Sequence, residues 1–370
     1  MQIKTKDVLI NLLGYAIGYR ELCENNLKSL EVKDWNALYR LSCQQGVAAI
    51  VLNAMVRSGY DRTMIPSSLK YQWISKTLNT EKYINKLTIT SKQVASILRE
   101  HDLFLLALKG ISYATYYENP LHREYGDLDC YVGSMENGRF VWGTRCTDVN
   151  RIMEHNGATV YDKDYKHFHI HFNDIDIENH IYCVPVLNDS RLFDLEVFLN
   201  FLLQEGTANE IQDTGLFKPP ATFSALYMIS HAFSHFLIEG IKLKHIADWI
   251  LFLKADQNSV DWELVYNWYD KLGYTKFVNS LNYIAKKYFR IPLESPLLTI
   301  DNRFSQMIID DCFRDSSVYN RRYSLFESRI AKLRNIYQGR WKFKKIYDRN
   351  PIIYVARLGL NYMKYGILRR

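Results

Sequence analysis

Asp127 and Asp129, two aspartates separated by a single residue, lie in a short and mostly apolar run of the chain. They restrict which secondary structure this run can form and which kind of site it can carry. On a strand, residues two apart point to the same face, so both carboxylates would share one face, with Leu128 on the other. Buried like charges repel each other unless a cation lies between them. Because carboxylate oxygens suit Mg²⁺, or Mn²⁺, we expect a strand that carries a divalent-cation site on Asp127 and Asp129.

The segment before the two aspartates has the pattern of a phosphate-binding turn. An apolar run over residues 103–108 indicates a strand that ends at Lys109-Gly110, and we expect a helix to begin near Ser112. The N–H groups and positive dipole at a helix N-terminus bind phosphate, and Gly110 lets the backbone approach closely. Lys109 and Ser112 would add a charge and a hydroxyl. Arg123, in the following loop, is either a further phosphate contact or a surface residue.

A β-hairpin is predicted further along the chain, over residues 166–182. Two stretches with alternating polarity flank Asn173-Asp174, which we interpret as a two-residue turn. This turn would place His169 opposite Glu178 and His171 opposite Asp176. One polar face, which we expect to form the wall of a site, would then carry His169, His171, Asp176, Glu178 and His180. Zn²⁺ binding by His169, His171 and His180 is an alternative to pairing of the histidines with the acids.

Hydrophobic periodicity divides the chain into three regions. Residues 1–100 and 191–370 have apolar residues at three- and four-residue spacing, typical of helices, whereas strand patterns are confined to residues 101–190. A strand, a helix, a strand and a hairpin in one region predict an α+β fold, with a small mixed sheet between two helical regions. No stretch of about 18 residues is free of polar groups, so we expect no transmembrane segment. Six widely spaced cysteines, with no C-x-x-C pair, favour a reducing cytoplasm.

The C-terminal segment is strongly basic. Residues 320–370 carry 14 Lys/Arg against two acids, in a chain whose net charge is +7. Basic and aromatic residues are interleaved from Arg340 to Tyr347, a pattern that suits nucleic-acid contact through phosphate pairing and base stacking. The alternatives are contact with an anionic membrane surface, together with the amphipathic stretch 352–368, and a solvated helical face.

The motif L-K-G-x-S-x-A over residues 108–114 is followed by P-L-H-R-E-Y-G-D-L-D-C-Y-V over residues 120–132. Together they resemble the poorly characterised bacterial nucleotidyltransferase family proteins of the DNA polymerase β-like nucleotidyltransferase superfamily. Those proteins show L-K-G and then R-x-x-G-D-I-D inside a largely helical chain. Gly110-Ile111-Ser112 stands where the superfamily usually has Gly-Gly or Gly-Ser. The resemblance extends to the helical stretch 231–249 and is weak beyond about residue 330.

This resemblance implies a polymerase β-like core that transfers a nucleoside monophosphate from an NTP to an acceptor and releases pyrophosphate. It implies two-metal chemistry in which Asp127 and Asp129 hold one or two Mg²⁺. It favours Glu178 as the third acid, which would ligate the second metal or accept the acceptor proton, with Asp176 as the runner-up. The acceptor (a small molecule, a protein or an RNA) and the choice of NTP stay open. A non-catalytic NTP- or nucleic-acid-binding protein on the same fold is the alternative. The resemblance also places three residues across the cleft from the sheet: Lys244, His245 and Asp248.

Overall fold

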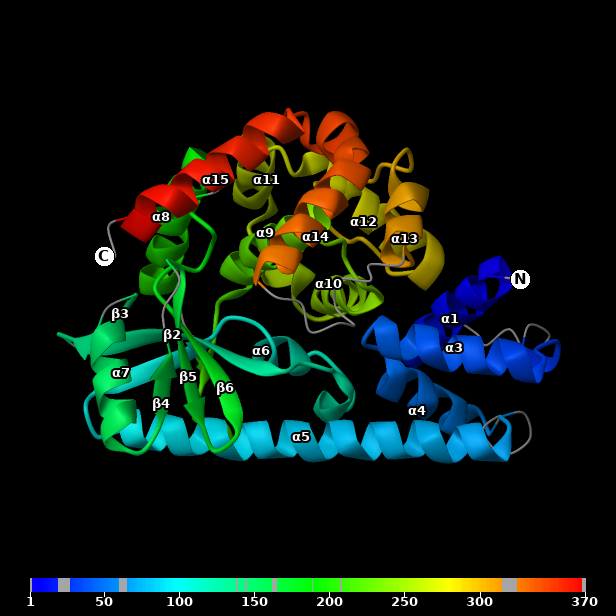
Figure 1. Cartoon of the computed structure of the whole chain (residues 1–370), viewed down its shortest axis with the longest axis horizontal. Coiled ribbons are helices and arrows are strands. Elements are labelled where there is room, and N and C mark those ends of the chain that lie inside the picture. The colour runs from blue at the N-terminus through cyan, green and yellow to red at the C-terminus, as the bar shows by residue number, and fades with distance from the viewer. Residues whose placement is uncertain are drawn as a thin grey trace.

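The computed structural model describes residues 2–18, 27–59, 65–137, 139–143, 145–161, 165–187, 189–206, 208–314 and 325–367. One mixed eight-stranded sheet lies among many helices, in agreement with the expected α+β class (Figure 1). The strands follow an N-terminal group of helices in the chain, and a larger group of helices follows them. Within the described ranges, each helix is too short or too polar to cross a lipid bilayer.

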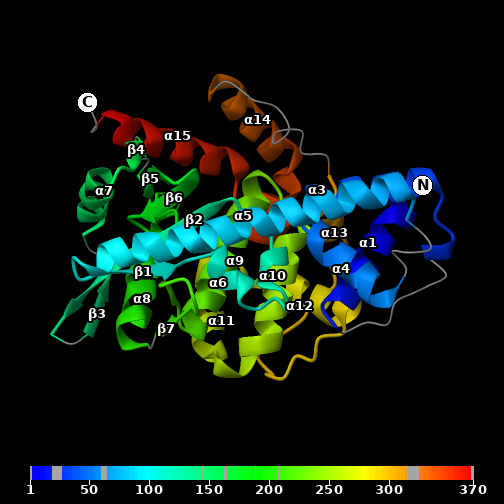
Figure 2. The same cartoon turned by 90° about the horizontal axis from the view of Figure 1, so that it is seen from below.

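Four described helices precede the sheet: α1 (Gln2–Ala16), α3 (Val32–Gln44), α4 (Ala48–Ser58) and α5 (Ser67–Arg99). The long helix α5 begins directly after Pro66, as the Pro-Ser-Ser pattern predicts. Its buried residues recur at three- and four-residue spacing and form one apolar stripe. One end of this stripe packs on α3 and α4, and the other end packs on β1 and β2 (Figures 1 and 2). A single helix therefore connects the N-terminal helices at one end with the sheet at the other.

The strands are β1 (Leu103–Ala107), β2 (Asp127–Glu136), β3 (Arg139–Trp142), β4 (Thr159–Tyr161), β5 (His167–Phe172), β6 (Ile175–His180), β7 (Asn209–Glu210) and β8 (Phe217–Lys218). Their order is β4-β5-β6-β2-β1-β8-β7, with β3 paired to β2. Strand β2 is antiparallel to β1 and parallel to β6, which makes the sheet mixed. Because β7 and β8 belong to it, the sheet extends beyond residues 101–190, the expected limits of the core.

Helices cover both faces of the sheet. Alternate residues of β1 and β2, such as Leu105 and Leu128, pack with α5 and with α7 (Cys146–His155) in one apolar cluster. The intervening residues, such as Leu106 and Tyr131, belong to a larger cluster with α8 (Ser190–Glu205) and α9 (Ala221–Ile238). The alternation of the strand therefore directs Asp127 and Asp129, which share the parity of Tyr131, toward the C-terminal helices.

The hairpin of β5 and β6 forms with the predicted turn and the predicted register. Asn173 and Asp174 both have positive φ, at 52° and 54°, as a two-residue hairpin turn of the primed type requires. Phe172 then pairs with Ile175, His171 with Asp176 and His169 with Glu178. The apolar face of the hairpin lies in the core, with Phe168, Ile170, Ile175 and Ile177 buried.

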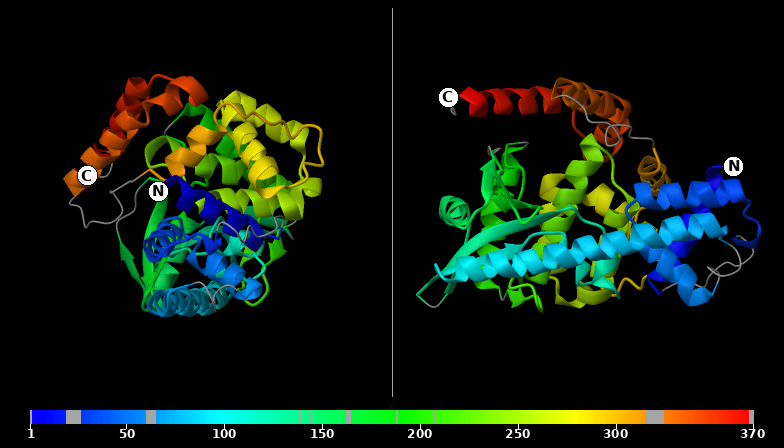
Figure 3. Two further views of the ribbon diagram at one scale, coloured as in Figure 1. Left: turned by 90° about the vertical axis from the view of Figure 1, so that its right-hand side faces the viewer. Right: turned by 60° about the horizontal axis from the view of Figure 1, so that its bottom comes forward.

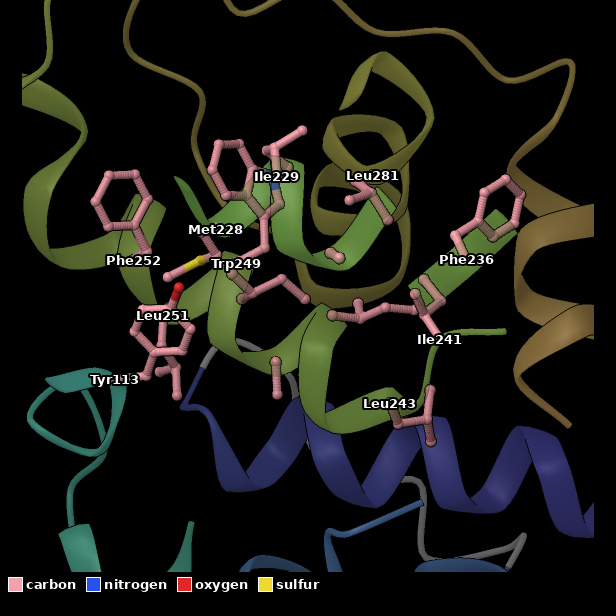
Figure 4. Close-up of a cluster of buried hydrophobic side chains, with 14 of the residues drawn as sticks. Tyr113, Met228, Ile229, Phe236, Ile241, Leu243, Trp249, Leu251, Phe252 and Leu281 are labelled. Carbon is pink, nitrogen blue, oxygen red and sulfur yellow. The ribbon is translucent and has the colours of Figure 1, made fainter. Parts of the chain in front are cut away.

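The C-terminal helices form the largest part of the hydrophobic core. After α9 come α10 (Leu243–Asp256), α11 (Trp262–Leu272), α12 (Thr275–Phe289) and α13 (Ser305–Cys312). Helix α9 is buried over most of its circumference, and its Ile229 and Phe236 belong with Trp249 of α10 to the cluster of Figure 4. The Asp261 side chain accepts a hydrogen bond from the Leu264 N–H, 3.1 Å away, and caps α11.

The basic C-terminal segment is folded onto this helical core. It comprises α14 (Leu325–Gln338), a π-helical turn (Lys342–Tyr347) and α15 (Pro351–Ile367), with α14 and α15 on the far side of the molecule from α5 (Figure 3). Phe343 and Tyr347 are buried, and the buried Lys342 ammonium donates to the Phe236 carbonyl oxygen at 2.6 Å. Phe343 and Tyr347 therefore belong to the core and are not exposed for base stacking, and contact of the basic tail with nucleic acid stays a prediction.

Candidate active site

A cavity of about 880 Å³ lies where the three regions of the chain meet. Its walls include Arg40 from α3, Asp127 and Asp129 from β2, His231 from α9 and Lys244 from α10. The two aspartates that the sequence singles out therefore face a space of the size that small-molecule sites have in other proteins.

Parallel pairing of β2 with β6 brings the third expected carboxylate to this pair. Asp129 lies beside Glu178 in the register, and Asp127 lies beside Asp176. Oxygen atoms of Asp127, Asp129 and Glu178 lie within 4.8 Å of one another. Asp176 is directed elsewhere: its side chain is 72% exposed and bonds to His171 Nδ1 at 2.8 Å. The geometry thus gathers Asp127, Asp129 and Glu178, the three residues expected to act together, and leaves the runner-up outside.

The three carboxylates fit a divalent cation. Asp129 is 1% exposed, and its Oδ2 is buried without a hydrogen-bond partner in the described part of the chain. Its other oxygen, Oδ1, forms an ion pair with the Lys109 ammonium at 2.9 Å and lies 3.1 Å from His180 Nε2. A buried carboxylate oxygen without a donor is costly unless a ligand satisfies it, and oxygen-only sites suit Mg²⁺.

Asp127 and Asp129 have opposite pKa shifts. Burial, and then repulsion from Asp129, raises the pKa of Asp127 to about 6. Burial alone would also raise the pKa of Asp129, but the adjacent Lys109 and His180 outweigh it and hold this pKa well below the usual range. The pKa of Lys109 is raised, because the pull of the three carboxylates exceeds the effect of its own burial. Asp129 and Lys109 therefore form a permanently charged pair, whereas Asp127 exchanges its proton near neutral pH.

The turn after β1 requires a glycine. Gly110 has φ 59° and ψ −103°, which lies outside the left-handed region that other residues adopt. A Cβ atom at this position would stand 3.0 Å from Tyr125 Cδ2. This close approach of the turn to Tyr125 puts Lys109 and Gly110 on the cavity wall next to Asp127 and Asp129.

Ser112 does not reach the cavity. The helix after the turn, α6 (Ile111–Ala114), is only four residues long and begins one residue before Ser112. Ser112 is 1% exposed, is absent from the cavity wall, and its carbonyl oxygen accepts the Thr115 hydroxyl at 2.7 Å. Of the turn residues expected to contact phosphate, Lys109 and Gly110 are at the cavity and Ser112 is inside the fold.

Arg123 lines the cavity but is bound to an acid on the opposite wall. Its Nε and Nη2 atoms each donate to one oxygen of Asp248 at 2.8 Å, and the Tyr117 hydroxyl donates to the same carboxylate at 2.7 Å. Arg123 is 5% exposed, so it is a buried structural cation rather than a surface residue. Its Nη1 is buried without a hydrogen-bond partner in the described structure, and that atom is the one left for a ligand.

The wall opposite the sheet carries the three residues that the resemblance named. Lys244, His245 and Asp248 all line the cavity. Burial, together with the nearby Arg123 and Lys242, lowers the pKa of Lys244 to about 8. Burial, followed by neighbouring positive groups, keeps the pKa of His245 well below its usual value, so its imidazole is neutral. Lys244 can therefore change its charge in the physiological range, whereas His245 acts as a neutral hydrogen-bonding group.

Sequence reasoning missed the contribution of the N-terminal helices to this cavity. Lys6 of α1 and Arg40 of α3 line it, as do Lys242 and Arg314 from the C-terminal region. Lys6 and Arg40 precede Asp127 by many residues and sit in ordinary amphipathic helices, so no local pattern distinguishes them from solvated surface cations. The hairpin prediction also missed His167, which lies beside Glu178, whereas His171 is paired with Asp176.

Comparison with known proteins gives one family. The sequence profile of a family described as uncharacterised nucleotidyltransferase matches residues 31–290. No curated protein matches this chain, and no solved structure does. The match includes α3 to α12 and the whole sheet, and with it both walls of the cavity except Lys6 and the residues after 290. Because that match extends over more than half of the sequence, the chain belongs to this family of uncharacterised nucleotidyltransferases.

Proposed function

We propose that the protein transfers a nucleoside monophosphate from an NTP to an acceptor, with Mg²⁺ held by Asp127, Asp129 and Glu178. The observation that carries this proposal is the trio of carboxylates, of which Asp127 and Asp129 line the cavity and Asp129 Oδ2 is buried without a hydrogen-bond partner in the described structure. The arrangement of β1, the Gly110 turn and β2 resembles the core of the DNA polymerase β-like superfamily. Unpaired cysteines, among them Cys130 and Cys183, fit a reducing compartment such as the cytoplasm.

The chemistry assigned to each residue follows from its charge and position. Bound Mg²⁺ would neutralise triphosphate charge. Lys109, permanently charged, and Lys244, on the facing wall, are placed to contact phosphate oxygens from two sides. The acceptor nucleophile bonds to the α-phosphorus, the bond from that phosphorus to the bridging oxygen breaks, and pyrophosphate leaves. A carboxylate of the trio accepts the proton of the acceptor.

The test is transfer of label from α-³²P-labelled NTPs, with Mg²⁺, to small-molecule, RNA and protein pools from a cell extract. Asp127→Asn and Asp129→Asn should each reduce transfer by at least about 10³-fold, since removal of charge-stabilising groups has effects of that size. Asp176→Asn is the matched control, because Asp176 is the next acid in the same register but is exposed. This variant should transfer label like the parent protein.

Two results would count against the proposal. Transfer that persists in Asp127→Asn and Asp129→Asn would contradict the site. Tight binding of Mg²⁺-NTP without transfer to any pool would favour the alternative, a non-catalytic nucleotide-binding protein on the same fold.

A further inference from the structure

The histidines of the β5–β6 hairpin meet Glu178 on the side away from Asp127. His167 and His180 are direct partners across the hairpin, and Glu178 lies two residues before His180 on the same face. His167 Nε2 is 3.5 Å from Glu178 Oε1, and His180 Nε2 is 3.5 Å from Glu178 Oε2. The candidate ligand atoms of the three residues all lie within 4.8 Å of one another.

These separations match a tetrahedral transition-metal site. With metal–ligand bonds of about 2.0–2.1 Å, two ligand atoms of a tetrahedron lie about 3.4 Å apart. The two nitrogen–oxygen distances of 3.5 Å, one to each oxygen of Glu178, are close to this spacing. Two imidazole nitrogens and one carboxylate are a frequent catalytic zinc set, and they differ from the oxygen-only set of Asp127 and Asp129.

His180 presents one ring nitrogen to the carboxylates and the other to the backbone. Its Nδ1 lies 3.2 Å from the Tyr182 carbonyl oxygen. Its Nε2 lies 3.1 Å from Asp129 Oδ1 and 3.5 Å from Glu178 Oε2, and the side chain is fully buried. A carbonyl that fixes the tautomer of a ligating imidazole is a usual feature of metal sites.

We propose that His167, Glu178 and His180 bind a borderline-soft divalent metal of the Zn²⁺ class, next to the Mg²⁺ position and sharing Glu178 with it. His169 is a neighbour of this set, with its Nε2 3.1 Å from His167 Nε2. The proposal goes beyond nucleotidyl transfer, because the binding of this metal is measured without any NTP or acceptor.

The experiment uses the full chain, stripped of metal by chelation and titrated with Zn²⁺ and with Co²⁺ in excess Mg²⁺. One equivalent should bind, and Co²⁺ should give the visible absorption of a tetrahedral site. His167→Gln should weaken Zn²⁺ binding by at least about 100-fold, the upper end of the effect of removing an outer-shell partner. His171→Gln is the control: His171 is on the same strand and face, but pairs with Asp176 and should leave the affinity unchanged.

Other results would overturn the proposal. These are parent-like Zn²⁺ affinity in His167→Gln, an equal loss in His171→Gln, or a folded parent protein that binds no Zn²⁺. Asp127→Asn should keep Zn²⁺ binding while losing Mg²⁺-dependent transfer; if it loses both, a single metal occupies the carboxylate trio. Because the readout is metal binding, the inference and the proposed function can fail independently. Circular dichroism of each variant verifies that it is folded.

Discussion

Asp127 and Asp129 are two residues apart on one strand, yet only one of them has a positive partner. Lys109 and His180 both contact Asp129 Oδ1, whereas Asp127 has burial and a like charge as its main influences. As a result, the pKa of Asp129 lies well below its usual range, and Asp127, with a pKa of about 6, is the acid that limits cation binding near neutral pH.

Mg²⁺ affinity should therefore depend on pH through Asp127. Below about pH 6 the carboxyl group is protonated in the metal-free protein, so affinity should fall roughly tenfold per pH unit, with uptake of Mg²⁺ releasing one proton. Calorimetric titration in buffers of different ionisation enthalpy measures both quantities. Asp127→Asn should bind Mg²⁺ weakly with little pH dependence. An unchanged affinity between pH 5 and pH 7 in the parent protein would contradict the raised pKa.

The same shift affects stability without metal. The folded state binds the Asp127 proton more tightly than the unfolded chain, whose carboxyl has an ordinary pKa of about 4. Stability of the metal-free protein should consequently decrease as pH rises from about 4 to about 6, and Mg²⁺ should remove that penalty.

For individual residues, the sequence predicts which carboxylates lie together better than it predicts the partners of the cationic side chains. Strand alternation is a local rule that predicts a shared face for Asp127 and Asp129, and the two-residue turn predicts the hairpin register. The choice of Glu178 came from the family resemblance, and its place beside Asp129 depends on the parallel pairing of β2 with β6. The pairing of Arg123 with Asp248 joins residues far apart in the chain, and no local rule predicts it. The contact of Arg123 with phosphate consequently stays a prediction. It depends on one nitrogen atom, Nη1, which has no hydrogen-bond partner in the described structure.

Among the elements, the turn at Gly110 has the most restricted backbone conformation. Gly110→Ala combines a disallowed backbone conformation with a Cβ placed 3.0 Å from Tyr125 Cδ2, and should destabilise the protein by about 1–3 kcal/mol. Urea denaturation measures the change, and transfer activity should fall with it because Lys109 shifts.

Gly126→Ala is the matched control for this turn. A Cβ at Gly126 meets nothing within 4 Å, and its φ is not positive, so stability should change by less than about 1 kcal/mol. Equal effects of the two substitutions would contradict the strain assigned to Gly110.

Elements with a strong local pattern were predicted, and those without one were not. Helices such as α9, and the β5–β6 hairpin, have long periodic segments or a turn dipeptide. Strands β7 and β8 have two residues each, too few to show alternation, and they form only because β1 offers β8 an edge to pair with. The short helix α6 ends after one turn, so its length too is set by tertiary packing.

For the whole molecule, the buried pair of Arg123 and Asp248 joins the core to α10. Removing one partner leaves an uncompensated buried charge, so Arg123→Met should destabilise the protein by about 3–5 kcal/mol. The double variant with Asp248→Leu should recover much of this loss. Chemical denaturation of the two single variants and the double variant gives the coupling energy.

An exposed ion pair provides the comparison. Arg303 and Asp301 are 2.6 Å apart, but the Arg303 side chain is 69% exposed, so Arg303→Met should change stability by no more than about 1 kcal/mol. If Arg123→Met lowers the free energy of unfolding by no more than Arg303→Met does, the buried pair does not join the two regions energetically.

Helix α5, 33 residues long, extends for about 50 Å. It contacts α3, which supplies Arg40, near one end, and β1, which leads to Lys109, near the other. Each residue of an α-helix advances the chain by about 100° around the axis. The relative orientation of Arg40 and Lys109 on the cavity wall thus depends on the rotation about the helix axis between the two contacts. Adding or deleting one residue between the two contacts would turn one wall away from the other by more than a quarter of a revolution. The side chains on the exposed face of α5 can therefore vary without changing this orientation, whereas the number of residues in α5 is fixed by the shape of the cavity.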